Sequence, residues 1–62
     1  MTHDEIQRGD RLRVKEGHHR FSGIAGSVRK IYKGEGGAWI VELENAWERV
    51  MRVRPSGLER VE

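Results

Sequence analysis

The stretch GDRLRVKEGHHRFSGIAGSV, residues 9–28, decides the fold because it predicts two strands joined by a loop that glycines bracket. Apolar and basic residues alternate over 11–15, so Leu12 and Val14 face one side and the basic side chains face the other. A half-buried first strand is therefore expected here. The loop that follows covers residues 16–23, and the second strand begins shortly after it.

The second strand, expected over 27–32, carries two signs of distortion. Gly23 and Gly26 lie just before it, at a spacing that suits a sharp bend or bulge where the backbone needs positive φ. The apolar residues at its far end then break the alternation with a period of two. The sequence therefore predicts a bulge or a strong twist near Lys30.

The rest of the chain predicts three more short strands separated by turns. The first of them has the strongest strand signal, and apolar residues on both of its faces indicate that one face can meet a partner chain. In chain order these segments are the flexible connection 33–37, the strand 38–43, the turn 44–48, the strand 49–54, the 3-10-like turn 55–57 and the strand 58–61.

Five short strands with this turn punctuation predict an all-β fold, a small five-stranded SH3-like barrel with a 3-10 turn before the last strand. The barrel is expected over 9–62, after a flexible N-terminal lead-in over 1–8. Residues 4–7 of the lead-in fit either one helical turn or a short edge strand, and Ile6 is expected to pack on the barrel. Barrels of this size are mostly binding modules, so the fold favours adhesion over chemistry.

Composition limits the chain to one domain with a thin core. Its 62 residues are 35% hydrophobic and 35% charged, and a chain this short buries only about 60% of its unfolded surface. Cysteine is absent, so either the barrel packs well or self-association buries more surface. No apolar run approaches the roughly 20 residues that cross a bilayer, and no signal peptide is visible, which predicts a cytoplasmic protein.

Charge is mild and mixed in sign. Twelve Lys and Arg stand against ten Asp and Glu, for a net charge of +2, which does not by itself indicate a nucleic-acid-binding protein. Arginine outnumbers lysine. Because the guanidinium group is planar and donates in pairs, this excess favours bidentate contacts to phosphate or carboxylate.

A glycine-hinged pattern is carried by Gly9, Leu12, Val14, Gly17, Gly23, Gly26 and Val28. With it, residues 9–31 resemble the KOW motif, a strand–loop–strand unit of ribosomal proteins and transcription elongation factors. A longer match over 18–23, 37–43 and 53–55 is similar to an archaeal and eukaryotic large-subunit ribosomal protein family with the same barrel. The resemblance implies that the basic loop and the outer-strand arginines contact RNA.

A second resemblance rests on Gly-Asp-Arg-Leu-Arg at 9–13 and Leu-Glu-Arg-Val at 58–61. Both segments resemble plasmid-borne type II dihydrofolate reductases, short SH3-like barrels whose homotetramers bind NADPH and dihydrofolate in one central pore. The segment 50–53 stands where that family has Val-Gln-Ile-Tyr. The resemblance implies NADPH as cofactor, attracted through its phosphates by Arg52, in a pore lined by Lys15, Val50, Met51 and Arg52.

The loop residues His18, His19 and Arg20 form the first candidate contact to RNA. Two imidazoles and a guanidinium can clamp a phosphate or stack on bases, and the alternative is a solvated loop with no partner. A metal site needs three or four converging ligands. No third histidine or cysteine is placed to help, because His3 lies in the lead-in, so no metal is expected.

Two basic stripes on strands form the second candidate contact. Arg11, Arg13 and Lys15 share the outer face of the first strand, and Arg52 and Arg54 share that of the fourth, which places Met51 and Val53 inward. Together the stripes can bind phosphates, each contact adding to a salt-dependent affinity. The alternative is an ordinary solvated face whose cations pair with Glu42, Glu44 or Glu48.

The two tryptophans have different expected roles. Trp39 shares a strand face with Val41 and Leu43, so packing in the core is the favoured interpretation, although stacking on bases or an interface role is open. Trp47 lies in a turn between Ala46 and Glu48. There, an aromatic anchor for a partner or for RNA and a local packing cap are equally compatible with the sequence.

No nucleophile or paired acids stand in a recognisable catalytic context, so no catalytic residue is assigned. The favoured function is a noncatalytic KOW-like module that binds RNA or a ribosome- or transcription-associated partner, with Trp47 as an aromatic anchor. The alternative is a homotetrameric relative of type II dihydrofolate reductase, in which pore geometry alone holds two ligands together. A third possibility is a protein-interaction or oligomerisation domain.

Overall fold

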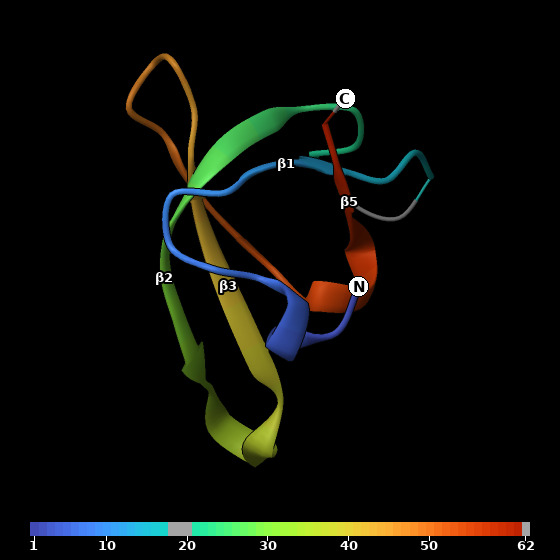
Figure 1. Ribbon diagram of the computed structural model, residues 1–62, viewed down its shortest axis with the longest axis vertical. Coiled ribbons are helices and arrows are strands. Elements are labelled where there is room, and N and C mark those ends of the chain that lie inside the picture. Colours follow the sequence, from blue (N-terminus) through green and yellow to red (C-terminus); the bar gives the residue numbers. More distant parts are fainter. Residues whose placement is uncertain (18–20, 62) are drawn as a thin grey trace.

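The computed structural model describes residues 1–17 and 21–61, which form one antiparallel five-stranded sheet and three short 3-10 helices (Figure 1). The fold class predicted from the sequence is confirmed in its all-β content, its five strands and the 3-10 turn before the last strand, and the barrel is left open between β4 and β5. The strand order in the sheet is β4-β3-β2-β1-β5. The elements are η1 (His3–Glu5), β1 (Arg11–Val14), β2 (Ala25–Lys33), η2 (Glu35–Gly37), β3 (Trp39–Glu44), β4 (Val50–Val53), η3 (Pro55–Gly57) and β5 (Leu58–Arg60).

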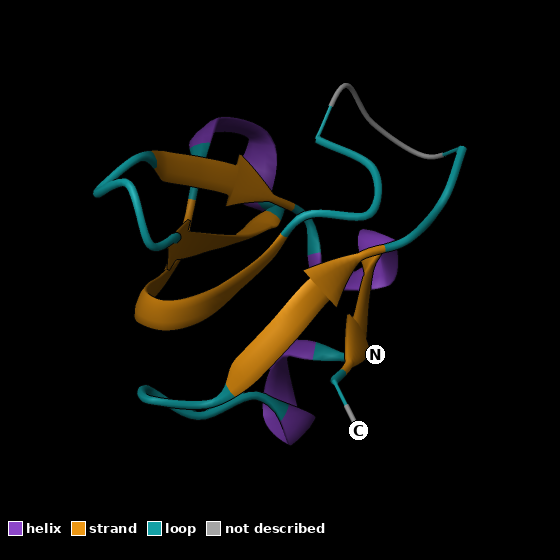
Figure 2. Cartoon of the chain, turned by 90° about the horizontal axis from the view of Figure 1, so that it is seen from above, coloured by secondary structure: helices purple, strands orange, loops and turns teal. Residues whose placement is uncertain are grey.

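The sheet curls around the core, and its two edge strands come from the end of the chain (Figure 2). No strand pairing joins β4 to β5 among the described residues, so the sheet stays open along that seam. The link between them is η3, where Pro55 supplies a preset φ and the Gly57 N–H bonds to the Arg54 carbonyl oxygen at 2.9 Å. This short link sends the chain from β4 to the far edge beside β1.

The distortion expected in the second strand is present at its middle. The pairing of β2 with β3 shifts register between Val28 and Lys30, so Arg29 is the extra residue of a bulge. Gly23 has a positive φ of 80°, as predicted. The prediction of positive φ at Gly26 is wrong, because Gly26 lies within β2. Glycine is needed there because a Cβ would lie 2.9 Å from the Glu44 carbonyl oxygen.

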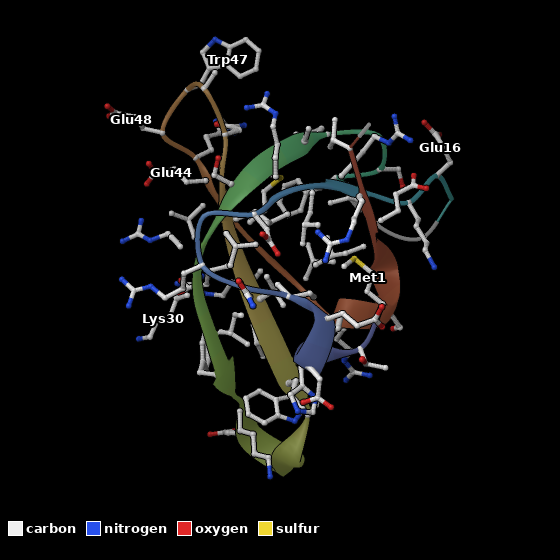
Figure 3. The ribbon with its side chains drawn as sticks, viewed as in Figure 1. Met1, Glu16, Lys30, Glu44, Trp47 and Glu48 are labelled. Carbon is white, nitrogen blue, oxygen red and sulfur yellow. The ribbon has the colours of Figure 1, made fainter. Side chains whose placement is uncertain are left out.

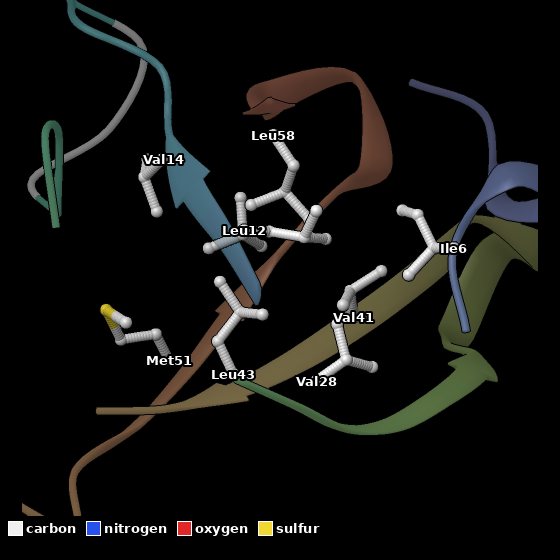
Figure 4. Close-up of a cluster of buried hydrophobic side chains, with 9 residues drawn as sticks. Ile6, Leu12, Val14, Val28, Val41, Leu43, Met51 and Leu58 are labelled. Carbon is white, nitrogen blue, oxygen red and sulfur yellow. The ribbon is translucent and has the colours of Figure 1, made fainter. Parts of the chain in front are cut away.

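Among the described residues, nine apolar side chains form the core (Figure 4). The alternation of β1 buries Leu12 and Val14, and β4 turns Met51 and Val53 inward, as the sequence predicts. Trp39 is only half-buried and lies outside this cluster, so its assignment to the core is wrong. The core residues are Ile6, Leu12, Val14, Val28, Val41, Leu43, Met51, Val53 and Leu58.

The N-terminal segment forms a helical turn, the first of the two conformations that the sequence left open. In η1 the Thr2 N–H and hydroxyl donate to one carboxylate oxygen of Glu5, at 2.9 and 3.0 Å. These bonds stabilise the charged carboxylate and lower the pKa of Glu5, the backbone bond contributing most. Ile6 follows the turn and packs into the core, as expected.

Candidate nucleic-acid interface

The strand register determines which charges meet on the outer face of the sheet. On β1, Arg13 lies opposite Glu59 of β5, and the Arg13 Nε is 3.1 Å from the Glu59 Oε1. Arg11 lies opposite Ser27 of β2, which carries no charge. One arginine of the β1 stripe is therefore occupied by a carboxylate, and the other is exposed beside a neutral neighbour.

A similar division separates the two arginines predicted for the fourth strand. Glu42 of β3 lies between Lys30 of β2 and Arg52 of β4, with 3.5 Å between the Arg52 Nε and the Glu42 Oε1. The Glu42 side chain is only 12% exposed, whereas that of Arg52 is 66% exposed. Arg54 follows the end of β4 and is exposed.

Arg11 and Arg54 are thus the predicted arginines without an ion pair within residues 1–17 and 21–61, whereas Arg13 and Arg52 each have one. The pairing expected for an ordinary strand face is present for Arg52, with Glu42 as partner, and Arg13 uses a glutamate that the sequence did not suggest. The two stripes are not on neighbouring strands, because β2 and β3 lie between β1 and β4 in the sheet.

The structure adds a residue that the sequence analysis missed. Arg29, the bulged residue of β2, turns outward, and its Nη1 is 3.0 Å from the Glu44 Oε2. It borders a hollow of about 280 Å³ between β1, β2 and the β3–β4 turn. In the sequence, the only sign of this arrangement is the bulge predicted near Lys30. The bulge turns two consecutive basic side chains, Arg29 and Lys30, toward solvent. The hollow is lined by Arg11, Ala25, Gly26, Ser27, Val28, Arg29, Glu44, Asn45 and Ala46.

Trp47 projects from the tip of the β3–β4 hairpin and is 80% exposed (Figure 3). The tip is held by Asn45, whose Oδ1 accepts hydrogen bonds from the N–H groups of Trp47 and Arg49, both at 3.0 Å. Glu48 takes a positive φ of 60° to complete the turn. A local packing cap, one of the two roles left open for Trp47, does not fit this exposure, so the indole is a presented surface.

An apolar groove of about 420 Å³ lies on the other side of Asn45. Ile24 and Val50 contribute apolar side chains to it, and Arg49 lies at its border with Asn45. Phe21 and Met51 complete the lining. The groove and the hollow therefore share one residue, Asn45, at the foot of the same hairpin.

The residues implied for a reductase pore differ in their exposure. Met51 is buried in the core, while Val50 and Lys15 are half-buried and Arg52 is exposed. The backbone N–H of Lys15 bonds to the Gly57 carbonyl oxygen of η3 at 2.9 Å. Arg52 is engaged with Glu42.

The remaining predicted contacts, His18, His19 and Arg20, lie outside the described residues. In the part of the chain that is described, no group of three or more His, Cys, Asp or Glu side chains is placed to hold a metal ion. No helix over these residues is long and apolar enough to cross a membrane. Comparison of the chain with protein-family models, with curated proteins and with solved structures finds no match.

Proposed function

We propose that this protein is a noncatalytic RNA-binding module whose outward arginines supply the affinity. The observation that supports it is a division among the four predicted strand arginines: Arg13 and Arg52 are each paired with a glutamate, and Arg11 and Arg54 have no ion pair among the described residues. An unpaired guanidinium can donate to phosphate without first losing a carboxylate partner. Arg11 and Arg54 are therefore the principal phosphate contacts, and Arg13 and Arg52 contribute less.

The size of the molecule is compatible with one RNA strand reaching both arginines. Its longest dimension is 28 Å, so a chain of several nucleotides spans it. Each neutralised phosphate releases condensed counterions, and the logarithm of the affinity for a single strand falls by about 0.7 per contact for each tenfold rise in salt. The affinity of this module is accordingly expected to be strongly salt-dependent even though its net charge is only +2.

The test is a fluorescence-anisotropy titration of a labelled RNA 12-mer at several salt concentrations, with two matched double variants. Arg11→Gln with Arg54→Gln removes two arginines that have no ion pair within the described residues, and Arg13→Gln with Arg52→Gln removes two that have one. Each double variant loses two positive charges, so the two variants are matched in net charge. The first variant is expected to reduce the salt slope by about 1.4, for two lost contacts. The second is expected to reduce it by less.

Circular dichroism of both variants checks that the fold is kept, since surface ion pairs of this kind contribute only about 0–1 kcal/mol to stability. Equal losses of slope in the two variants would show that ion pairing does not decide which arginines bind. An unchanged RNA affinity in both, or no salt-dependent binding by the wild-type protein, would overturn the proposed function and favour a protein partner.

A further inference from the structure

The tip of the β3–β4 hairpin combines two features that suit one nucleotide. The first is the Trp47 indole, presented to solvent on a turn that Asn45 holds with two hydrogen bonds. An aromatic ring held open in this way is a stacking surface for a base, and stacking tolerates any sequence because every base has a π-face. The indole does not have to be uncovered before a base can use it.

The second feature is the hollow at the foot of the same hairpin. Its lining includes Arg11 and Arg29, and it extends to Ala46, the residue before Trp47. Arg11 has no carboxylate partner in the described part of the chain, while Arg29 is held by Glu44. Two arginines in the lining of a hollow of about 280 Å³ suit a phosphate group.

Resting on the proposed function, we infer that this tip selects single-stranded RNA, stacking an unpaired base on Trp47 and receiving an adjacent phosphate between Arg11 and Arg29. In a duplex both faces of each base are covered by its neighbours, so the indole has no ring to contact. The basic lining of the hollow favours this ligand over a protein segment. Glu44 limits the affinity, because its carboxylate competes with phosphate for Arg29.

The experiment compares one RNA 12-mer alone and annealed to its complement, titrated against the wild-type chain, three test variants and one control variant. Trp47→Ala is expected to weaken single-strand binding roughly 5- to 150-fold, the range for loss of one stacked base, and to leave duplex binding unchanged. Arg11→Gln is expected to weaken single-strand binding and to reduce its salt slope by about 0.7. Glu44→Gln is expected to tighten it at least about twofold and to steepen the slope.

The matched control is Lys33→Gln, which removes one positive charge at the last residue of β2, paired with the first residue of β3 and away from the β3–β4 hairpin. It is expected to change binding less than Arg11→Gln. Because Trp47 is exposed, Trp47→Ala leaves the fold intact. Quenching of Trp47 emission by the RNA in a Trp39→Phe background gives a second readout that needs no change at the tip.

Two results would overturn the inference while leaving the proposed function standing. They are equal affinity for the single strand and the duplex, and single-strand binding that Trp47→Ala and Glu44→Gln do not alter. Absence of salt-dependent binding to either RNA would overturn the proposed function itself, and the tip would then be an anchor for a protein. Strand selectivity that is lost in Trp47→Ala would support the inference.

Discussion

The two ends of β3 each carry a tryptophan, and the two indoles have opposite environments. Trp39, at the first residue of β3, stacks on His3 with ring centroids 4.1 Å apart and an angle of 12° between the planes, and the Lys33 Nζ lies 5.5 Å from its ring centre. Trp47, three residues beyond the end of β3, is 80% exposed. One tryptophan holds the N-terminal segment, and the other is exposed to solvent.

The difference arises from what lies beside each end of the strand. The N-terminal segment reaches the Trp39 end, since η1 places His3 against the indole and Ile6 in the core. At the other end the chain leaves the sheet in a turn that is held by its own side chain, Asn45, and nothing among the described residues covers the ring. An exposed indole on a fixed turn is therefore a property of the tertiary arrangement.

The largest expected effect on stability comes from substituting the glycines that lie near the two ends of β3. In Gly26→Ala the new Cβ meets the Glu44 backbone oxygen at 2.9 Å, which cannot move aside without distorting β3. Unfolding free energy is expected to fall by about 2 kcal/mol. In Gly34→Ala, at the other end, the nearest atom is a side-chain carbon of Ile40 at 3.1 Å. Urea denaturation should show a smaller loss for Gly34→Ala, and equal losses would contradict this explanation.

Truncating each tryptophan should separate structure from function. Trp39→Ala removes a half-buried ring and its stack on His3, and is expected to cost about 2 kcal/mol of stability. Trp47→Ala removes an exposed ring and is expected to change stability by no more than about 0.5 kcal/mol. Thermal unfolding of both variants measures the difference. A marked destabilisation by Trp47→Ala would mean that the indole packs against the protein.

Asn45→Ala tests whether the tip is held in place. It removes the acceptor for two backbone N–H groups, and because these groups then bond to water, the expected cost is only about 1 kcal/mol. Hydrogen exchange of the Trp47 and Arg49 amides should accelerate in the variant, while that of the Lys33 and Trp39 amides stays unchanged. Unaltered exchange at Trp47 would show that the turn does not depend on this side chain.

The smallest expected effect is a change at acid pH near Trp39. The bonds from Thr2 lower the pKa of Glu5 in the folded state, so their stabilisation is complete above the unfolded pKa and is lost as the pH falls through the folded value. Trp39 emission, read in a Trp47→Phe background, should therefore change at acid pH as η1 loosens. Glu5→Gln should show less of this change, and an identical acid response in both forms would remove Glu5 as its source.

Local patterns of the sequence were sufficient for the strands but not for the site. Alternation placed Leu12, Val14, Met51 and Val53 inward, and a break in alternation located the bulge, because each pattern depends only on neighbouring residues. The partner of Arg13 is Glu59, a residue 46 positions away, and this pairing exists only because β5 returns beside β1. Local periodicity carries no information about such a neighbour.

By itself, the sequence determined the fold class, the buried faces of β1 and β4, and the turn at η3, since side-chain period, proline and glycine act within a few residues. Only the tertiary structure decided which arginines are neutralised, that Arg29 borders the hollow with Arg11, and that Trp39 is covered while Trp47 is not. These outcomes depend on strand register and on where the N-terminal segment packs, and both join residues far apart in the chain.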